Sequence, residues 1–164
     1  MCKIGMPNRN PGTYLLHELP YFCTVNPPTG GRNEPDKNRN DMYLEKIDSP
    51  ADVKRLSVGE LTLLSGEIRE ALHKVSAHGG YFGPNLGMVE ATVALHYVFD
   101  SPKDKLVFDV SRQSYVHKML TGRRRAFLDP AEYDGVSGYS EPSESEHDHF
   151  VIGHTSTSVS LAGG

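Results

Sequence analysis

The sequence predicts an α/β fold, in which helices pack against a parallel sheet. Hydrophobic residues recur every three or four positions between Ser57 and Gly79, which indicates an amphipathic helix. A mostly apolar run at residues 106–110 precedes a polar loop and a helical pattern over residues 112–121, as in a buried parallel strand followed by a helix. Helix, strand and helix in this order indicate a layered α/β architecture.

Length, charge and cysteine content limit the class of protein. The 164 residues suffice for about one domain, and no apolar stretch approaches the length of a membrane span. The net charge of −4 argues against nucleic-acid binding, since basic residues cluster only at residues 123–125. Both cysteines, Cys2 and Cys23, lie near the N-terminus without metal-site spacing. We therefore expect a cytoplasmic protein that binds neither nucleic acid nor membrane.

The composition divides the chain near Met42. Residues 1–41 contain six of the eleven prolines and show neither a helical nor a strand period, so we predict a disordered leader. Met42 opens a segment that resembles an ordinary protein start, which suggests that the leader is upstream sequence. The predicted folded domain is residues 42–164.

Helix boundaries can be assigned from local patterns. Ser49, Pro50 and Asp52 indicate the start of a short helix that runs through Leu56. Ser57 and Glu60 form a capping box, and Gly79-Gly80 is a typical helix end. One face of the helix between them is apolar: Leu61, Leu64, Ile68, Leu72 and Val75.

The second half of the chain contains three further predicted segments. Residues 86–99 form a helix that is apolar on most sides, so we expect it to be buried between other elements. Residues 126–150 are polar and acidic with several prolines and glycines, which predicts a long surface loop. Residues 153–158 then lead into the beginning of another helix.

The glycine and hydroxyl residues at 153–157 form the best candidate ligand site that residue chemistry identifies. Backbone N–H groups at a helix start attract a phosphate or diphosphate, although from the residues alone a simple helix cap by Thr155 or Ser156 explains the pattern better. His147, His149 and His154 lie close together, but we interpret them as exposed loop histidines and assign no metal ligand. Neither a dinucleotide fingerprint nor a P-loop sequence occurs.

Residues 43–164 resemble the beginning of the 1-deoxy-D-xylulose-5-phosphate synthases, thiamine-diphosphate enzymes of the transketolase superfamily. Six ordered blocks carry the resemblance: YLEKI at 43–47, NLGMVE at 85–90, ALHYVF at 94–99, HKMLTGR at 117–123, SESEHD at 143–148 and GHTSTS at 153–158. The resemblance implies the N-terminal part of a three-layer α/β fold that binds the diphosphate of the cofactor. It also implies a homodimer when the protein is complete.

The implied reaction condenses pyruvate with glyceraldehyde 3-phosphate on thiamine diphosphate, releasing CO2 and supplying precursors of isoprenoids, thiamine and pyridoxal phosphate. By resemblance, Gly153, His154 and Thr155 contact the cofactor, while the Mg²⁺ ligands lie beyond Gly164. We therefore expect the isolated chain to be incomplete and inactive.

Two residues depart from the family pattern at catalytic positions. Tyr81 and Arg112 stand where the family has histidines that are assigned to proton transfer or stabilisation of an intermediate. Tyrosine and arginine ordinarily titrate near pH 10 and above pH 12, which suits them poorly to proton transfer at neutral pH. Tyr81 can still donate a hydrogen bond, and Arg112 can pair with the diphosphate or a substrate phosphate. His117 is interpreted as a structural helix residue.

Two alternatives follow from the same observations. One is a split transketolase, in which a short N-terminal subunit pairs with a separate partner chain, although the block HKMLTGR at 117–123 favours the synthase. The loss of both histidines also fits a degenerate, non-catalytic relative that serves as a binding or regulatory subunit.

Overall fold

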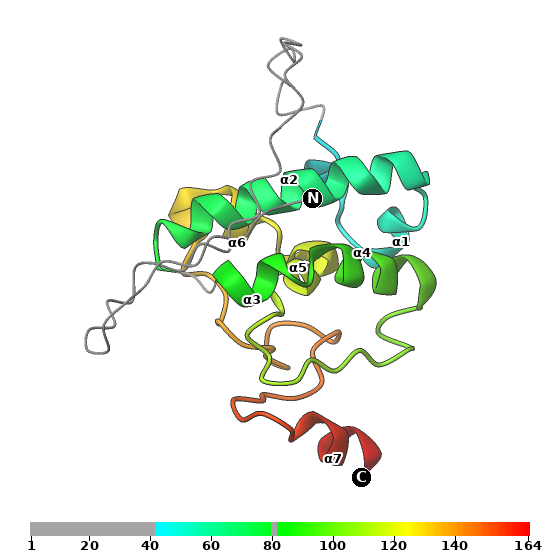
Figure 1. Ribbon diagram of the computed structural model, residues 1–164, viewed down its shortest axis with the longest axis vertical. Helices are drawn as coiled ribbons and strands as arrows, with labels where there is room; N and C mark the ends of the chain where they lie inside the picture. Colours follow the sequence, from blue (N-terminus) through cyan, green and yellow to red (C-terminus); the bar gives the residue numbers. More distant parts are fainter. Residues whose placement is uncertain (1–41, 80–81) are drawn as a thin grey trace, which may run out of the picture. The chain divides into compact units, whose positions relative to one another are not determined.

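The computed structural model describes residues 42–79 and 82–164, and their regular secondary structure is helical (Figure 1). The predicted leader, residues 1–41, and Tyr81 lie outside the described residues. The elements in chain order are η2 (Leu44–Lys46), α1 (Pro50–Val53), α2 (Val58–Ser76), α3 (Phe82–Leu86), α4 (Val89–Val98), α5 (Tyr115–Lys118), the π-helical segment η3 (Met119–Arg123), α6 (Arg125–Leu128), η4 (Pro130–Glu132) and α7 (Ser158–Gly163).

The capping residues of α1 and α2 confirm the predicted helix starts. The backbone N–H of Ser49 donates to Asp52 Oδ2 at 3.0 Å, and Pro50 occupies the first turn of α1. At α2, Ser57 N–H donates to Glu60 Oε2 at 2.7 Å, and Glu60 N–H donates to Ser57 Oγ at 3.4 Å. These exchanges satisfy N–H groups that have no partner within the helix. Helix α2 ends at Ser76, shortly before Gly79 with φ +96°.

The predicted apolar face of α2 forms one side of the hydrophobic core. Leu64, Ile68, Leu72 and Val75 are buried there, and α3, α4 and α6 pack against the helix. Residues of α5, η3 and α6 complete the core: Tyr115, Val116, Met119, Leu120, Ala126 and Phe127. In Figure 1, α2 runs across the molecule above α3 and α4.

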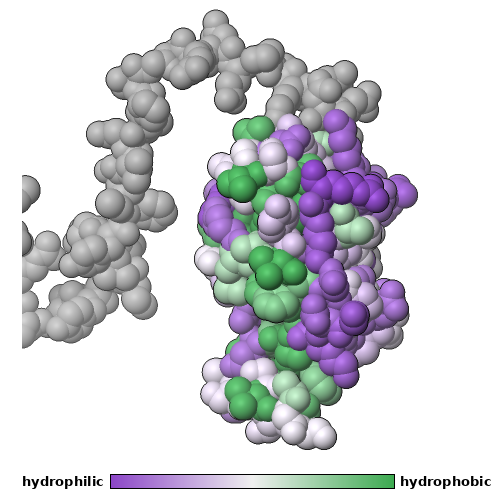
Figure 2. Space-filling model, turned by 90° about the vertical axis from the view of Figure 1, so that its right-hand side faces the viewer, coloured by the Kyte–Doolittle hydropathy of each residue, from purple (hydrophilic) through white to green (hydrophobic). Residues whose placement is uncertain are grey.

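The prediction that residues 86–99 are buried on most sides is wrong. The segment divides into the end of α3 and helix α4, and only one side of α4 is covered. Val98 is 66% exposed, and Tyr97 and Phe99 are also exposed. Figure 2 shows hydrophobic residues gathered on the face that carries this end of α4. No element of the described chain packs over that side, which explains why an almost wholly apolar helix remains half exposed.

The predicted strand at residues 106–110 is absent, so the structure does not confirm the α/β class. A parallel strand is held by hydrogen bonds to a neighbouring strand, and the described residues contain no other strand to supply them. The backbone also leaves the extended region at Val110 and Ser111, whose φ angles are +63° and +59°. These left-handed conformations are uncommon for a residue other than glycine, and strained for a β-branched valine.

The prediction of a surface loop over residues 126–150 is also wrong in part. The stretch includes most of α6, whose Phe127 is 1% exposed, and the 3-10 turn η4. Further along, Ser140 and Asp148 are buried. The acidic residues suggested solvent exposure, but two of them pair with cations of α5 and η3, as described below.

Within residues 42–79 and 82–164, no helix has both the length and the apolar character needed to cross a membrane.

Candidate functional site

Arg112 lies in the turn before α5, and contacts from two distant segments hold it. Its Nε and Nη2 atoms donate to the hydroxyl oxygen of Tyr139 at 3.0 and 2.7 Å. Its carbonyl oxygen accepts a hydrogen bond from Asn85 Nδ2 at 2.8 Å. Asn85 is fully buried and also accepts from the backbone N–H of Tyr115 at 2.9 Å. Both the backbone and the guanidinium group of Arg112 are therefore fixed.

The predicted cofactor residues Gly153, His154 and Thr155 lie on an exposed loop before α7. His154 Nδ1 lies 3.0 Å from the carbonyl oxygen of Thr155, and Thr157 Oγ1 donates to the carbonyl oxygen of His154 at 2.8 Å. A Cβ atom placed on Gly153 would meet no atom of the described chain within 4 Å. The loop thus has internal hydrogen bonds and an open side at Gly153.

Asp109 connects this loop to the segment that carries Arg112. Its carboxylate accepts from the backbone N–H groups of Ser156 at 2.8 Å and of Ser158 at 3.2 Å. The hydrogen bond from Ser156, followed by those from Ser158 and Thr157, lowers the pKa of Asp109. Asp109 is three residues before Arg112, so the contact attaches the loop to the segment that carries Arg112.

The same contact changes the predicted mode of anion binding. The N–H groups of Ser156 and Ser158 already donate to an internal carboxylate, as in a helix cap. The other groups whose chemistry suits a diphosphate are the Arg112 guanidinium, which also donates to Tyr139, the His154 ring, the Thr155 hydroxyl and the open backbone at Gly153. These are hydrogen-bond donors or can act as donors, which matches the chemistry of a diphosphate.

Two partly or fully buried carboxylates determine the path of the chain before this loop. Glu144 accepts from Lys118 Nζ at 2.5 Å, from Arg123 Nη1 at 3.1 Å and from the backbone N–H of Ser137 at 2.5 Å. The side chain of Lys118 is fully buried. Burial lowers the pKa of Lys118, while the hydrogen bond to Glu144 acts in the opposite direction. The pair joins α5 to residues 137–144.

Asp148 is the second carboxylate, and its side chain is fully buried. Arg123 donates to its two oxygens at 2.8 Å each, and the backbone N–H of Glu141 donates at 2.7 Å. Burial alone would raise the pKa of Asp148, but the hydrogen bonds from Arg123, His117 and Glu141 outweigh it and hold the pKa below its usual range. Asp148 therefore remains ionised.

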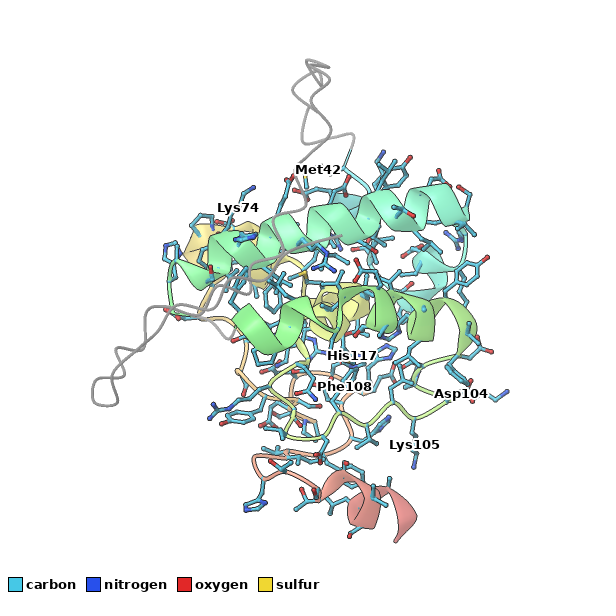
Figure 3. The ribbon with its side chains drawn as sticks, viewed as in Figure 1. Met42, Lys74, Asp104, Lys105, Phe108 and His117 are labelled. Carbon is cyan, nitrogen blue, oxygen red and sulfur yellow. The ribbon has the colours of Figure 1, made fainter. Side chains whose placement is uncertain are left out.

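A pair of buried histidines extends this network into the core. His117 Nε2 lies 3.1 Å from Asp148 Oδ1, and His117 Nδ1 lies 2.8 Å from His96 Nε2. The two rings stack with centroids 5.0 Å apart, and Phe108 packs on His117 with the same centroid separation. Figure 3 labels His117 and Phe108, which lie close together below α4. Burial, with smaller electrostatic contributions from His117, His147 and Lys54, lowers the pKa of His96 to about 3. The interpretation of His117 as a structural residue agrees with these contacts.

Three features were not predicted from the sequence: Asp109, Tyr139 and the carboxylate network. A polar residue near the end of the apolar run was a signal for Asp109, since ligand sites in α/β folds lie at the ends of strands. Tyr139 had no local signal, because its partner is 27 residues away. His147 and His149 are partly buried rather than exposed, and His147 Nδ1 lies 2.8 Å from Ser101 Oγ. Among the described residues, no group of three or more histidine, cysteine or acidic side chains is arranged to hold a metal ion.

Comparison with known proteins gives one consistent result. A sequence profile of the family described as 1-deoxy-D-xylulose-5-phosphate synthase matches residues 44–164. The synthase of Thermomicrobium roseum is 58% identical over 123 residues, which cover 74% of this chain and 20% of that protein. The synthase of Dictyoglomus turgidum is 54% identical over 122 residues, with the same coverage.

A third relative has a similar level of identity. The synthase of a Mycobacterium species is 56% identical over 122 residues, which cover 74% of this chain and 19% of that protein. The chain therefore spans about a fifth of the length of the curated relatives that it matches.

Removal of the Asp148 carboxylate tests the stabilising role of the network. We expect Asp148→Ala to lower the free energy of unfolding by about 3–5 kcal/mol, because Arg123 and His117 lose their buried partner. Glu132→Ala is the matched control: its partner Arg125 is 72% exposed, so we expect a loss below about 1 kcal/mol. Urea denaturation measures both, and equal losses would contradict the account.

The pH dependence of stability tests the burial of neutral His96. Its pKa is about 3 in the folded chain and about 6.5 when unfolded, so the unfolded state binds more protons below pH 6.5. Stability should therefore fall as the pH falls, with His96 alone contributing about 1.5 kcal/mol between pH 6.5 and pH 5. Denaturation curves at several pH values should show this loss, and His96→Gln should reduce it. A constant free energy of unfolding over that range would overturn the assignment.

Proposed function

The chain belongs to the 1-deoxy-D-xylulose-5-phosphate synthase family, and we propose that it supplies part of the cofactor-binding domain of such an enzyme. The match over residues 44–164 and identities of 54–58% to named synthases support the proposal. Within this proposal, the complete protein is a homodimeric, cytoplasmic transferase that condenses pyruvate with glyceraldehyde 3-phosphate. The three-layer α/β fold belongs to the proposal as well, since its strands are not present in the described residues.

Arg112 and the loop at residues 153–155 are the proposed contacts of thiamine diphosphate. When bound, the cofactor supplies the carbanion chemistry of the reaction. The role of the chain is to bind and orient the diphosphate through the Arg112 guanidinium, the His154 ring, Thr155 and the backbone of Gly153. Asp109 attaches the loop to the segment that carries Arg112 through its hydrogen bonds from Ser156 and Ser158. Mg²⁺ is proposed to bind through residues outside these 164.

The observation that carries this proposal is the way in which Arg112 is held. Its guanidinium group is fixed by Tyr139 and its backbone by buried Asn85, so the charge has a defined position. Arginine remains protonated at neutral pH, so Arg112 can bind an anion but cannot exchange protons there. We therefore expect it to replace the binding function of the family histidine without its acid–base function. Tyr81 is proposed to donate a hydrogen bond at the other histidine position.

The non-catalytic alternative rests on the same residue. A fixed arginine at a position assigned to proton transfer favours anion binding over turnover. A complete protein that binds thiamine diphosphate but forms no deoxyxylulose phosphate from pyruvate and glyceraldehyde 3-phosphate would support this alternative.

Titration of the 164-residue chain with inorganic diphosphate tests the anion role of Arg112. We expect Arg112→Ala to weaken binding by about tenfold, because a charge-assisted hydrogen bond is lost. Arg125→Ala removes the same charge from an exposed residue and should leave binding within about twofold. Calorimetry or NMR shift titration measures the affinities. Equal effects of the two variants, or no binding by the unmodified chain, would refute the role.

A further inference from the structure

A hydroxyl group that no prediction included contacts the guanidinium group of Arg112. We propose that Tyr139 is a positioning residue, which holds Arg112 in the orientation that binds the diphosphate group. The inference rests on the proposed function of Arg112. It adds a second residue that determines how tightly the chain binds diphosphate. It derives from the contact between two segments that lie 27 residues apart.

The geometry of the contact restricts the guanidinium group. Nε and Nη2 of Arg112 donate to the same hydroxyl oxygen at 3.0 and 2.7 Å. Two hydrogen bonds from different nitrogen atoms to one acceptor limit rotation of the guanidinium plane as well as its position. The Cζ atom of Arg112 also lies 5.3 Å from the centre of the Tyr139 ring, within the range of a cation–π contact.

Tyr139 is itself held by the carboxylate network. Its backbone N–H donates to Ser137 Oγ at 3.1 Å, and Ser137 N–H donates to Glu144 at 2.5 Å. Two residues after Tyr139, the backbone N–H of Glu141 donates to Asp148 at 2.7 Å. The hydroxyl of Tyr139 is therefore attached to a stretch that buried charges fix on both sides. A surface tyrosine on a loose loop could not orient a partner in this way.

The functional consequence follows from conformational entropy. A long arginine side chain loses rotamer freedom when it binds an anion, and that loss reduces the affinity. Contact with Tyr139 restricts the side chain before the anion arrives. Removal of the hydroxyl should therefore weaken diphosphate binding even though the tyrosine makes no contact with the anion.

The test uses the 164-residue chain and inorganic diphosphate as the probe. We expect Tyr139→Phe, which keeps the ring, to weaken binding by about threefold to tenfold. Tyr133→Phe removes a hydroxyl from the same stretch, where the ring packs on His78, and should leave the affinity unchanged. Thermal unfolding of both variants shows whether either change disturbs the fold.

A second arm shows whether the effect acts through Arg112. In an Arg112→Ala background, Tyr139→Phe should have no further effect on diphosphate binding, so the two changes are coupled. The NMR signal of the Arg112 Nε–H group should also exchange faster with water in Tyr139→Phe. A purely structural role would weaken binding equally in both backgrounds and would overturn the inference.

The remaining outcomes separate this inference from the proposed function. If the unmodified chain binds diphosphate and Tyr139→Phe binds it equally well, the positioning role fails while the function of Arg112 stands. If the unmodified chain does not bind diphosphate, the anion role of Arg112 fails and the role of Tyr139 fails with it.

Discussion

A carboxylate that is removed from water needs cations or hydrogen-bond donors as partners. Glu144 and Asp148 both have such partners within this chain. Together they accept hydrogen bonds from Lys118, Arg123 and His117. The two carboxylates therefore face two cations, Lys118 and Arg123, in a cluster that is nearly neutral overall. Breaking such a cluster leaves an uncompensated buried charge, which costs far more than an exposed ion pair is worth. Backbone N–H groups of Ser137 and Glu141, in the loop before Glu144, donate to the same two carboxylates. The position of that loop, and of every side chain it presents, therefore depends on these charges.

The two buried histidines extend the polar cluster towards α4. A hydrophobic replacement of similar size would often stabilise a core at least as well, so the value of a buried polar group lies in the arrangement it selects. His117 contacts both Asp148 and His96. These contacts form only when α4, α5 and the acidic loop pack in one relative arrangement. The same loop carries Tyr139 and thereby reaches Arg112. Core and candidate site are thus parts of one hydrogen-bonded system.

Local chemistry was predictable from the sequence, and contacts between distant residues were not. The capping box of Ser57 and Glu60 was predicted because both partners lie within one turn. The prediction of a strand at residues 106–110 was wrong, because an apolar run forms a strand only when a neighbouring strand can hydrogen-bond to it. The acidic loop was predicted to be exposed to solvent. Composition alone does not reveal that Lys118 donates to Glu144. The resemblance located Arg112, but only the structure identified what holds it.

Amide hydrogen exchange of the loop tests most directly whether buried charges fix its path. The account predicts that the N–H groups of Ser137 and Glu141, which donate to Glu144 and Asp148, exchange slowly. Their exchange should be as slow as that of amides in the middle of α2. Fast exchange at both residues, with α2 still protected, would mean that the carboxylates do not hold the loop. The proposed path from the buried cluster to Arg112 would then be contradicted.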